Sequence, residues 1–108
     1  MSHLDVVRLP GYQRRALASL ASLEKGWYLR SSLAGMLTAA VRLDDLEAAV
    51  QLLRWASTGG APLGRRLKGG RSFVFVDPDL LRVAWPELFH QEAPELVLGP
   101  VDLGEVDL

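Results

Sequence analysis

The chain contains no cysteine, no asparagine and only two histidines among its 108 residues. Without a thiol it cannot form disulfides, iron–sulfur sites, zinc fingers or a cysteine nucleophile. His3 and His90 stand far apart in the sequence, and two isolated imidazoles rarely make a zinc site or a Ser–His pair. We therefore expect no metal, no cofactor and no enzymatic activity.

Long apolar runs are also missing, since no stretch of 18 apolar residues occurs. The first residues lack the charged-then-apolar pattern of a secretory leader, so we expect a cytoplasmic protein that does not enter membranes. The composition, 49% hydrophobic and 23% charged, is typical of a folded chain. The length is enough for one domain with its own hydrophobic core.

The net charge of −1 conceals an uneven distribution. Residues 1–76 contain 11 basic and 5 acidic side chains, a difference of +6, whereas residues 77–108 contain one basic and 8 acidic side chains, a difference of −7. Such asymmetry is a hint of nucleic-acid contact or of an acidic tail. We expect a folded domain over residues 1–91 and an acidic C-terminal tail over residues 92–108.

Apolar residues at spacings of three and four predict two helices in the first half of the chain. The first covers residues 12–24 and has Ser19 and Ser22 on its outer face. Ser31 or Ser32 is expected to cap the second helix. Gly35 lies inside the second helix, where glycine costs about 1 kcal/mol, so it indicates close approach to a neighbouring helix.

A third helix is expected to begin with Asp44 as its N-cap and Glu47 three residues later, a variant of the capping box. The same helical spacing separates a buried side from an exposed stripe. The expected buried side consists of Leu46, Ala49, Val50, Leu52, Leu53 and Ala56. The exposed stripe consists of Asp44, Glu47, Gln51 and Arg54.

Strands are predicted at residues 27–29, 61–67 and 72–76. The last two are expected to form a hairpin through residues 68–71, because Gly69-Gly70 is a hairpin signal and β-forming residues follow it. Asp77-Pro78 is expected to open a short helical turn, and residues 86–90 a second one. The predicted fold class is therefore α+β.

The order helix, short strand, helix, helix, hairpin over residues 12–76 resembles the winged helix-turn-helix superfamily. This resemblance implies a small winged-helix domain of three helices and a two- or three-stranded wing sheet, followed by short C-terminal helical turns and the acidic tail. The hairpin would be the wing, and the third helix would enter the major groove of DNA. The implied function is a transcriptional regulator that binds duplex DNA, and we expect it to be a homodimer.

The expected wing is strongly basic and lacks acidic side chains between residues 61 and 76. Basic side chains that neutralise phosphates make DNA binding salt-dependent, although polar hairpin tips are also commonly just solvated. Gln51 and Arg54 are the side chains expected nearest to the bases. The expected phosphate contacts are Arg65, Arg66, Lys68 and Arg71.

The start of the third helix argues against DNA binding, because Asp44, Asp45 and Glu47 repel phosphates. These acids also stabilise a helix N-terminus through the helix dipole. The alternative function is a winged-helix protein–protein interaction module without DNA binding, which docks through the third helix and the C-terminal segment.

Residues 92–108 are open to three interpretations. They form a solubilising acidic tail, or fold over the basic hairpin and compete with nucleic acid, or pack on the body as a strand. The tryptophans 27, 55 and 85 adjoin apolar runs, so packing is favoured over base stacking, with Trp55 ambiguous beside the exposed stripe. The side chains that would pack in such a strand are Leu96, Val97, Leu98, Val101 and Leu103.

Overall fold

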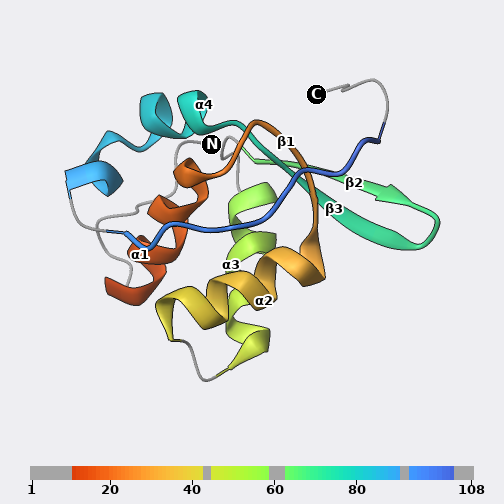
Figure 1. The fold of residues 1–108 in the computed structure, drawn as a ribbon, viewed down its shortest axis with the longest axis horizontal. Helices are drawn as coiled ribbons and strands as arrows, with labels where there is room; N and C mark the ends of the chain where they lie inside the picture. Colours follow the sequence, from red (N-terminus) through yellow and green to blue (C-terminus); the bar gives the residue numbers. More distant parts are fainter. Residues whose placement is uncertain (1–10, 43–44, 59–62, 91–92, 104–108) are drawn as a thin grey trace.

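The computed structural model describes residues 11–42, 45–58, 63–90 and 93–103, and it confirms the α+β class (Figure 1). The predicted order of helix, strand, helix, helix and hairpin is present. In chain order the elements are α1 (Gly11–Ser19), the 3-10 helix η2 (Leu20–Ser22), β1 (Gly26–Leu29), α2 (Arg30–Val41), α3 (Leu46–Thr58), β2 (Gly64–Lys68), β3 (Arg71–Val76), α4 (Pro78–Ala84) and the 3-10 helix η3 (Pro86–His90).

The three strands form one antiparallel sheet in the order β1-β3-β2. Strands β2 and β3 form the predicted hairpin, in which Lys68 pairs with Arg71 across a two-residue turn. Gly69 and Gly70 both have positive φ, 58° and 78°. A type I′ turn requires positive φ at both central positions, which glycine adopts without a steric penalty. Strand β2 extends one residue beyond the predicted end, to Lys68.

The sheet has an inner face against the helices and an outer face away from them. Tyr28 and Val74 are paired and belong to the main core, together with buried residues of α1, α2, α3 and α4. Trp27 and Phe75 are also paired and lie on the opposite face in a smaller cluster with Phe73. Their rings meet edge to face with centroids 5.2 Å apart. Alternation along each strand therefore assigns every hairpin side chain to one of two faces.

The C-terminal segment, residues 93–103, passes across the sheet at β1 (Figure 1). Leu96 is buried in the main core, and Leu103 is buried against the outer-face aromatic cluster. The amide of Val101 donates a 2.7 Å hydrogen bond to the carbonyl of Trp27. The amide of Leu96 donates a 2.8 Å bond to Ser22 Oγ.

These contacts favour packing on the body among the three interpretations of the C-terminal segment. Not all five side chains that were expected to pack on the body do so, because the side chain of Val97 is 80% exposed. A single bridge joins Val101 to Trp27, so the segment crosses β1 without forming a strand along it. Residues 92 and 104–108 of the expected tail lie outside the described residues.

Three expectations about the first two helices are wrong. Helix α1 ends at Ser19, and the turn that follows is 3-10. Ser19 is buried, with its hydroxyl donating a 2.8 Å bond to the carbonyl of Arg15 within the helix, and so does not face outward. Neither Ser31 nor Ser32 caps α2, because β1 runs directly into this helix and Leu29 occupies the N-cap without a side-chain bond.

The start of α3 also differs from expectation. Leu46 is 54% exposed and is not part of the core, because it is the first helical residue and lies one turn before Ala49. The expected cap, Asp44, lies outside the described residues. Asp45 performs a capping function, since its Oδ1 accepts a 2.9 Å hydrogen bond from the amide of Glu47.

Gly35 does not mark a close helix contact, because a Cβ at this position would meet nothing within 4 Å. The expectation of close helix approach is therefore wrong. We predict that Gly35→Ala raises the free energy of unfolding by about 0.5–1 kcal/mol, because alanine restricts the unfolded chain and favours the helix. Urea denaturation of both proteins measures this difference. A destabilised variant would show that the backbone at Gly35 needs glycine.

Tyr28 is fully buried, and its hydroxyl donates a hydrogen bond to the carbonyl of Glu24. Burial, with the nearby Glu24 charge, raises the pKa of Tyr28 above its ordinary value of 10.0. A raised pKa in the folded state stabilises the fold below about pH 10 and ceases to do so as the pH rises through the folded-state pKa. We predict that stability falls more steeply above pH 10 in the wild type than in Tyr28→Phe. Equal slopes in urea titrations at pH 9, 10 and 11 would contradict this.

Candidate functional site

The hairpin β2–β3 carries the four predicted basic residues, but the register divides them between two faces. Arg66 pairs with Phe73, and Lys68 pairs with Arg71. Residues paired across two strands lie on the same face of the sheet, and so do residues two positions apart on one strand. Phe73 lies on the outer face, so Arg66, Lys68 and Arg71 lie there too. Arg65 pairs with Val74 and therefore lies on the inner face, toward the helices.

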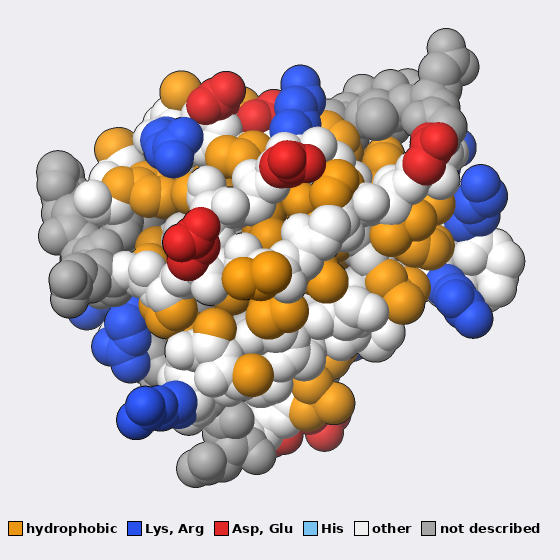
Figure 2. Space-filling view, viewed as in Figure 1, with side chains coloured by type: hydrophobic (Ala, Val, Ile, Leu, Met, Phe, Trp, Pro, Cys, Tyr) orange, Lys and Arg blue, Asp and Glu red, His pale blue; other side chains and the backbone are white. Residues whose placement is uncertain are grey.

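The outer-face basic residues Arg66, Lys68 and Arg71 form what we call the basic triad. Lys68 and Arg71 are exposed, and Arg66 is half-buried. Lys and Arg side chains gather where the hairpin ends, at the right edge of the space-filling view (Figure 2). The hairpin strands contain no Asp or Glu. The hairpin therefore carries three basic side chains on its outer face toward the far end of the sheet, and Figure 2 shows an acidic side chain near them.

The pairing of Lys68 with Arg71 opposes folding, because like charges directly opposite each other destabilise a sheet. Basic side chains on an edge strand such as β2 also prevent pairing with other chains, which is a reason for them other than a ligand. The Gly69-Gly70 turn beside them is exposed and carries no side chains, so a ligand can approach its backbone closely. An anionic partner would remove the repulsion and would gain several charge-assisted hydrogen bonds.

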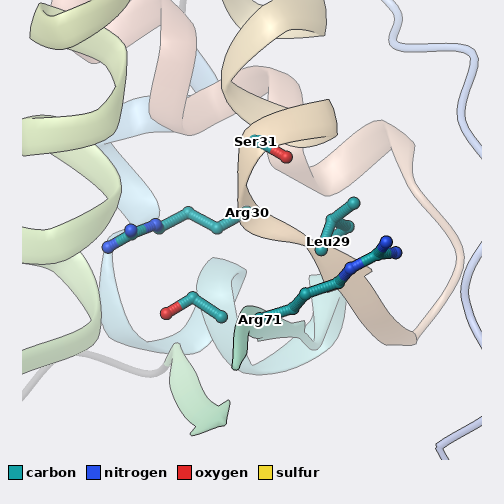
Figure 3. A pocket seen from close by; sticks show the side chains of 5 residues that line it. Leu29, Arg30, Ser31 and Arg71 are labelled. Atoms are coloured by element: carbon teal, nitrogen blue, oxygen red, sulfur yellow. The ribbon is translucent and has the colours of Figure 1, made fainter. Parts of the chain in front are cut away.

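A further basic residue, Arg30, lies beside the hairpin. The sequence pattern does not predict this position. The last β1–β3 pair joins Leu29 to Phe73, so the next residue, Arg30, lies beside Ser72, which is two residues from the Gly69-Gly70 turn. A pocket of about 460 Å³ opens there and is lined by Leu29, Arg30, Ser31, Arg71 and Ser72 (Figure 3). Only the pairing of β1 with β3 brings Arg30 to this place, and no local sequence signal indicates it.

The expected base-reading residues lie on α3, apart from the basic triad. Gln51 and Arg54 are exposed, as is Glu47 one turn earlier. Helix α3 packs in the layer on the inner side of the sheet, whereas the triad lies on the outer face. The structure therefore does not gather the six predicted site residues on one surface. Of the four basic hairpin residues, Arg65 is the one on the inner face, the same side of the sheet as α3.

The three tryptophans contribute to packing. Trp85 is buried and stacks on the half-buried Trp55, with ring centroids 6.2 Å apart and planes 17° apart. Trp27 is buried in the outer-face cluster. The ambiguity about Trp55 is thus resolved by its contact with Trp85. These rings do not form an open surface for stacking bases.

Comparison with protein-family models, with curated proteins and with solved structures gives no match for this chain. Within the described ranges, no three or more Asp, Glu or His side chains are grouped so that they could hold a metal ion. None of the helices in that part of the chain has the length and apolar character needed to cross a membrane.

Proposed function

We propose that this protein is a winged-helix transcriptional regulator that binds duplex DNA, with the hairpin β2–β3 as its wing. The order of elements and the three-stranded sheet support the winged-helix assignment. The observation that carries the DNA-binding function is the basic triad, with Lys68 opposite Arg71 and Arg66 on the same face. This arrangement costs folding energy and suits a polyanion.

The geometry of the triad favours contacts to several phosphates. Arg66 and Lys68 are two residues apart on one strand, a distance of about 6.8 Å. Arg71 approaches from the neighbouring strand. Three separated cations on one face of a projecting hairpin suit the phosphate backbone, because backbone contacts position a protein without reading sequence.

Helix α3 limits how much sequence the protein reads. The carboxylates of Asp45 and Glu47 lie at its N-terminal end, where they repel phosphates. Gln51 and Arg54 are exposed further along the helix and are the proposed base-reading residues. We therefore expect binding dominated by the backbone, with modest preference among sequences.

Fluorescence anisotropy with a labelled duplex of random sequence tests this function. Each phosphate contact lowers log K by about 0.9 per log unit of salt, so the triad alone predicts a slope of about −2.7. The titration is run between 50 and 200 mM salt. Absence of binding at 50 mM salt, or binding that does not weaken with salt, would refute the proposal.

The second candidate function is a protein interaction module, and the exposed Leu46 favours it. This side chain is 54% exposed between Asp45 and Glu47 at the start of α3. An exposed leucine among charges can anchor a protein partner or a second copy in the proposed homodimer. Self-association in sedimentation experiments that is lost in Leu46→Ala, together with no duplex binding, would favour this function over the first.

A further inference from the structure

The pocket lies where the hairpin extends past the end of β1, so it adjoins both the helical body and the proposed wing. Arg30 and Ser31 reach it from the start of α2, Leu29 from the end of β1, and Arg71 and Ser72 from the start of β3. We propose that this pocket binds a phosphate group, either of a nucleic-acid backbone or of a free phosphate compound. The nucleic-acid case rests on the proposed function, and the free-phosphate case does not.

The donors around the pocket match this ligand. A guanidinium group offers paired N–H donors whose spacing fits two phosphate oxygens. The hydroxyls of Ser31 and Ser72 add two further donors. None of the five lining residues is a carboxylate that would repel an anion. The pocket therefore offers hydrogen-bond donors and positive charge to an anion, and its lining contains no carboxylate.

Binding of a phosphate by both arginines requires them to turn toward each other. In Figure 3, Arg30 extends toward α3, whereas Arg71 extends past Leu29 in the opposite direction, so their guanidinium groups do not converge. An anion of charge near −2 favours their convergence. Arginine side chains have the rotational freedom to converge in this way.

The pocket is a hollow of about 460 Å³ that is open to solvent at the exposed residues Ser31 and Arg71. A phosphate bound there can therefore carry attached groups that extend out of the pocket. A nucleic-acid strand that contacts the basic triad could continue into this pocket, because Arg71 belongs to both.

Backbone amide NMR of the full chain tests the proposal with two ligands, inorganic phosphate at constant ionic strength and a duplex of random sequence. We expect saturable shifts of the Ser31 and Ser72 amides with at least one of them, and loss of these shifts in Arg30→Ala. Arg82→Ala is the matched control, because Arg82 is an exposed arginine on α4 outside the pocket. For the duplex, Arg30→Ala should weaken binding about 2- to 10-fold and reduce the salt slope by about 0.9.

The outcomes separate this inference from the proposed function. Shifts with inorganic phosphate but no duplex binding would support a free-phosphate site and contradict DNA binding. Shifts with the duplex that are lost in Arg30→Ala would support the nucleic-acid case. The inference is overturned if neither ligand shifts these amides, or if the shifts persist in Arg30→Ala. In that case duplex binding through the triad could still be intact.

Discussion

Leu96→Ala is expected to lower the free energy of unfolding by about 2–4 kcal/mol, which is a large part of the stability of a small domain. Leu96 is 4% exposed and belongs to the main core, although it lies in a segment without regular structure. Its amide also donates to Ser22 Oγ, and this bond holds the segment against η2. The substitution would therefore leave a cavity between the C-terminal segment and the helices. Chemical denaturation followed by circular dichroism measures the change.

Val97→Ala is the control, because Val97 is the next residue along the chain and is 80% exposed. Its effect should stay within about 0.5 kcal/mol. Equal effects of the two substitutions would contradict packing of this segment on the body. A loss limited to Leu96→Ala would show that residues 93–103 stabilise the fold even though the charge count of the sequence suggests a solubilising tail.

The second prediction concerns removal of the basic triad by Arg66→Ala, Lys68→Ala and Arg71→Ala together. If each side chain neutralises one phosphate, the slope of log K against log salt becomes less steep by about 2.7 when all three are removed. The affinity at 50 mM salt then falls by at least roughly 100-fold. The fold should be retained, because Lys68 and Arg71 are exposed and their mutual repulsion is relieved. Anisotropy at several salt concentrations gives both quantities, and circular dichroism checks the fold.

A charge-matched variant makes this experiment specific. Arg15→Ala, Lys25→Ala and Arg82→Ala together also remove three positive charges, all from exposed residues outside the hairpin. Lys25 and Arg82 form ion pairs with Asp77 and Asp79, 3.8 Å and 3.4 Å long, and such surface pairs contribute little to stability. The control should keep most of the affinity. Equal losses in both variants would mean that net charge, and not the hairpin, determines binding.

Much of the local structure follows from the sequence. Helical periodicity identifies the buried positions Ala49, Leu52 and Leu53 of α3, and all three are buried. The Gly69-Gly70 pair identifies the hairpin, because its turn needs two residues with positive φ. Asp77, followed by proline, marks the start of α4, and its carboxylate accepts from the amides of Asp79 and Leu80. Each of these features depends on residues within a few positions of one another.

The predictions that are wrong concern residues whose environment depends on contacts between distant parts of the chain. A serine suits an N-cap, but β1 enters α2 directly, so neither Ser31 nor Ser32 takes that position. A glycine inside a helix suits close packing, but no neighbour approaches Gly35. Leu46 has the correct spacing for the core, but the helix starts at this residue, outside the reach of the core. In each case the residue type is compatible with two environments, and only the path of the chain selects one.

The sequence by itself determined the types and order of the elements and the concentration of positive charge between residues 65 and 71, because these depend on neighbours in the chain. The tertiary structure decided which face of the hairpin packs on the helices, so that Arg66, Lys68 and Arg71 lie on the outer face and Arg65 on the inner one. That the three share a face follows from the Gly69-Gly70 turn, which sets the register of the hairpin. The tertiary structure also decided that Arg30 lies beside Ser72 and that Leu96 is buried. Those contacts join residues more than 40 positions apart, and a local pattern carries no information about them.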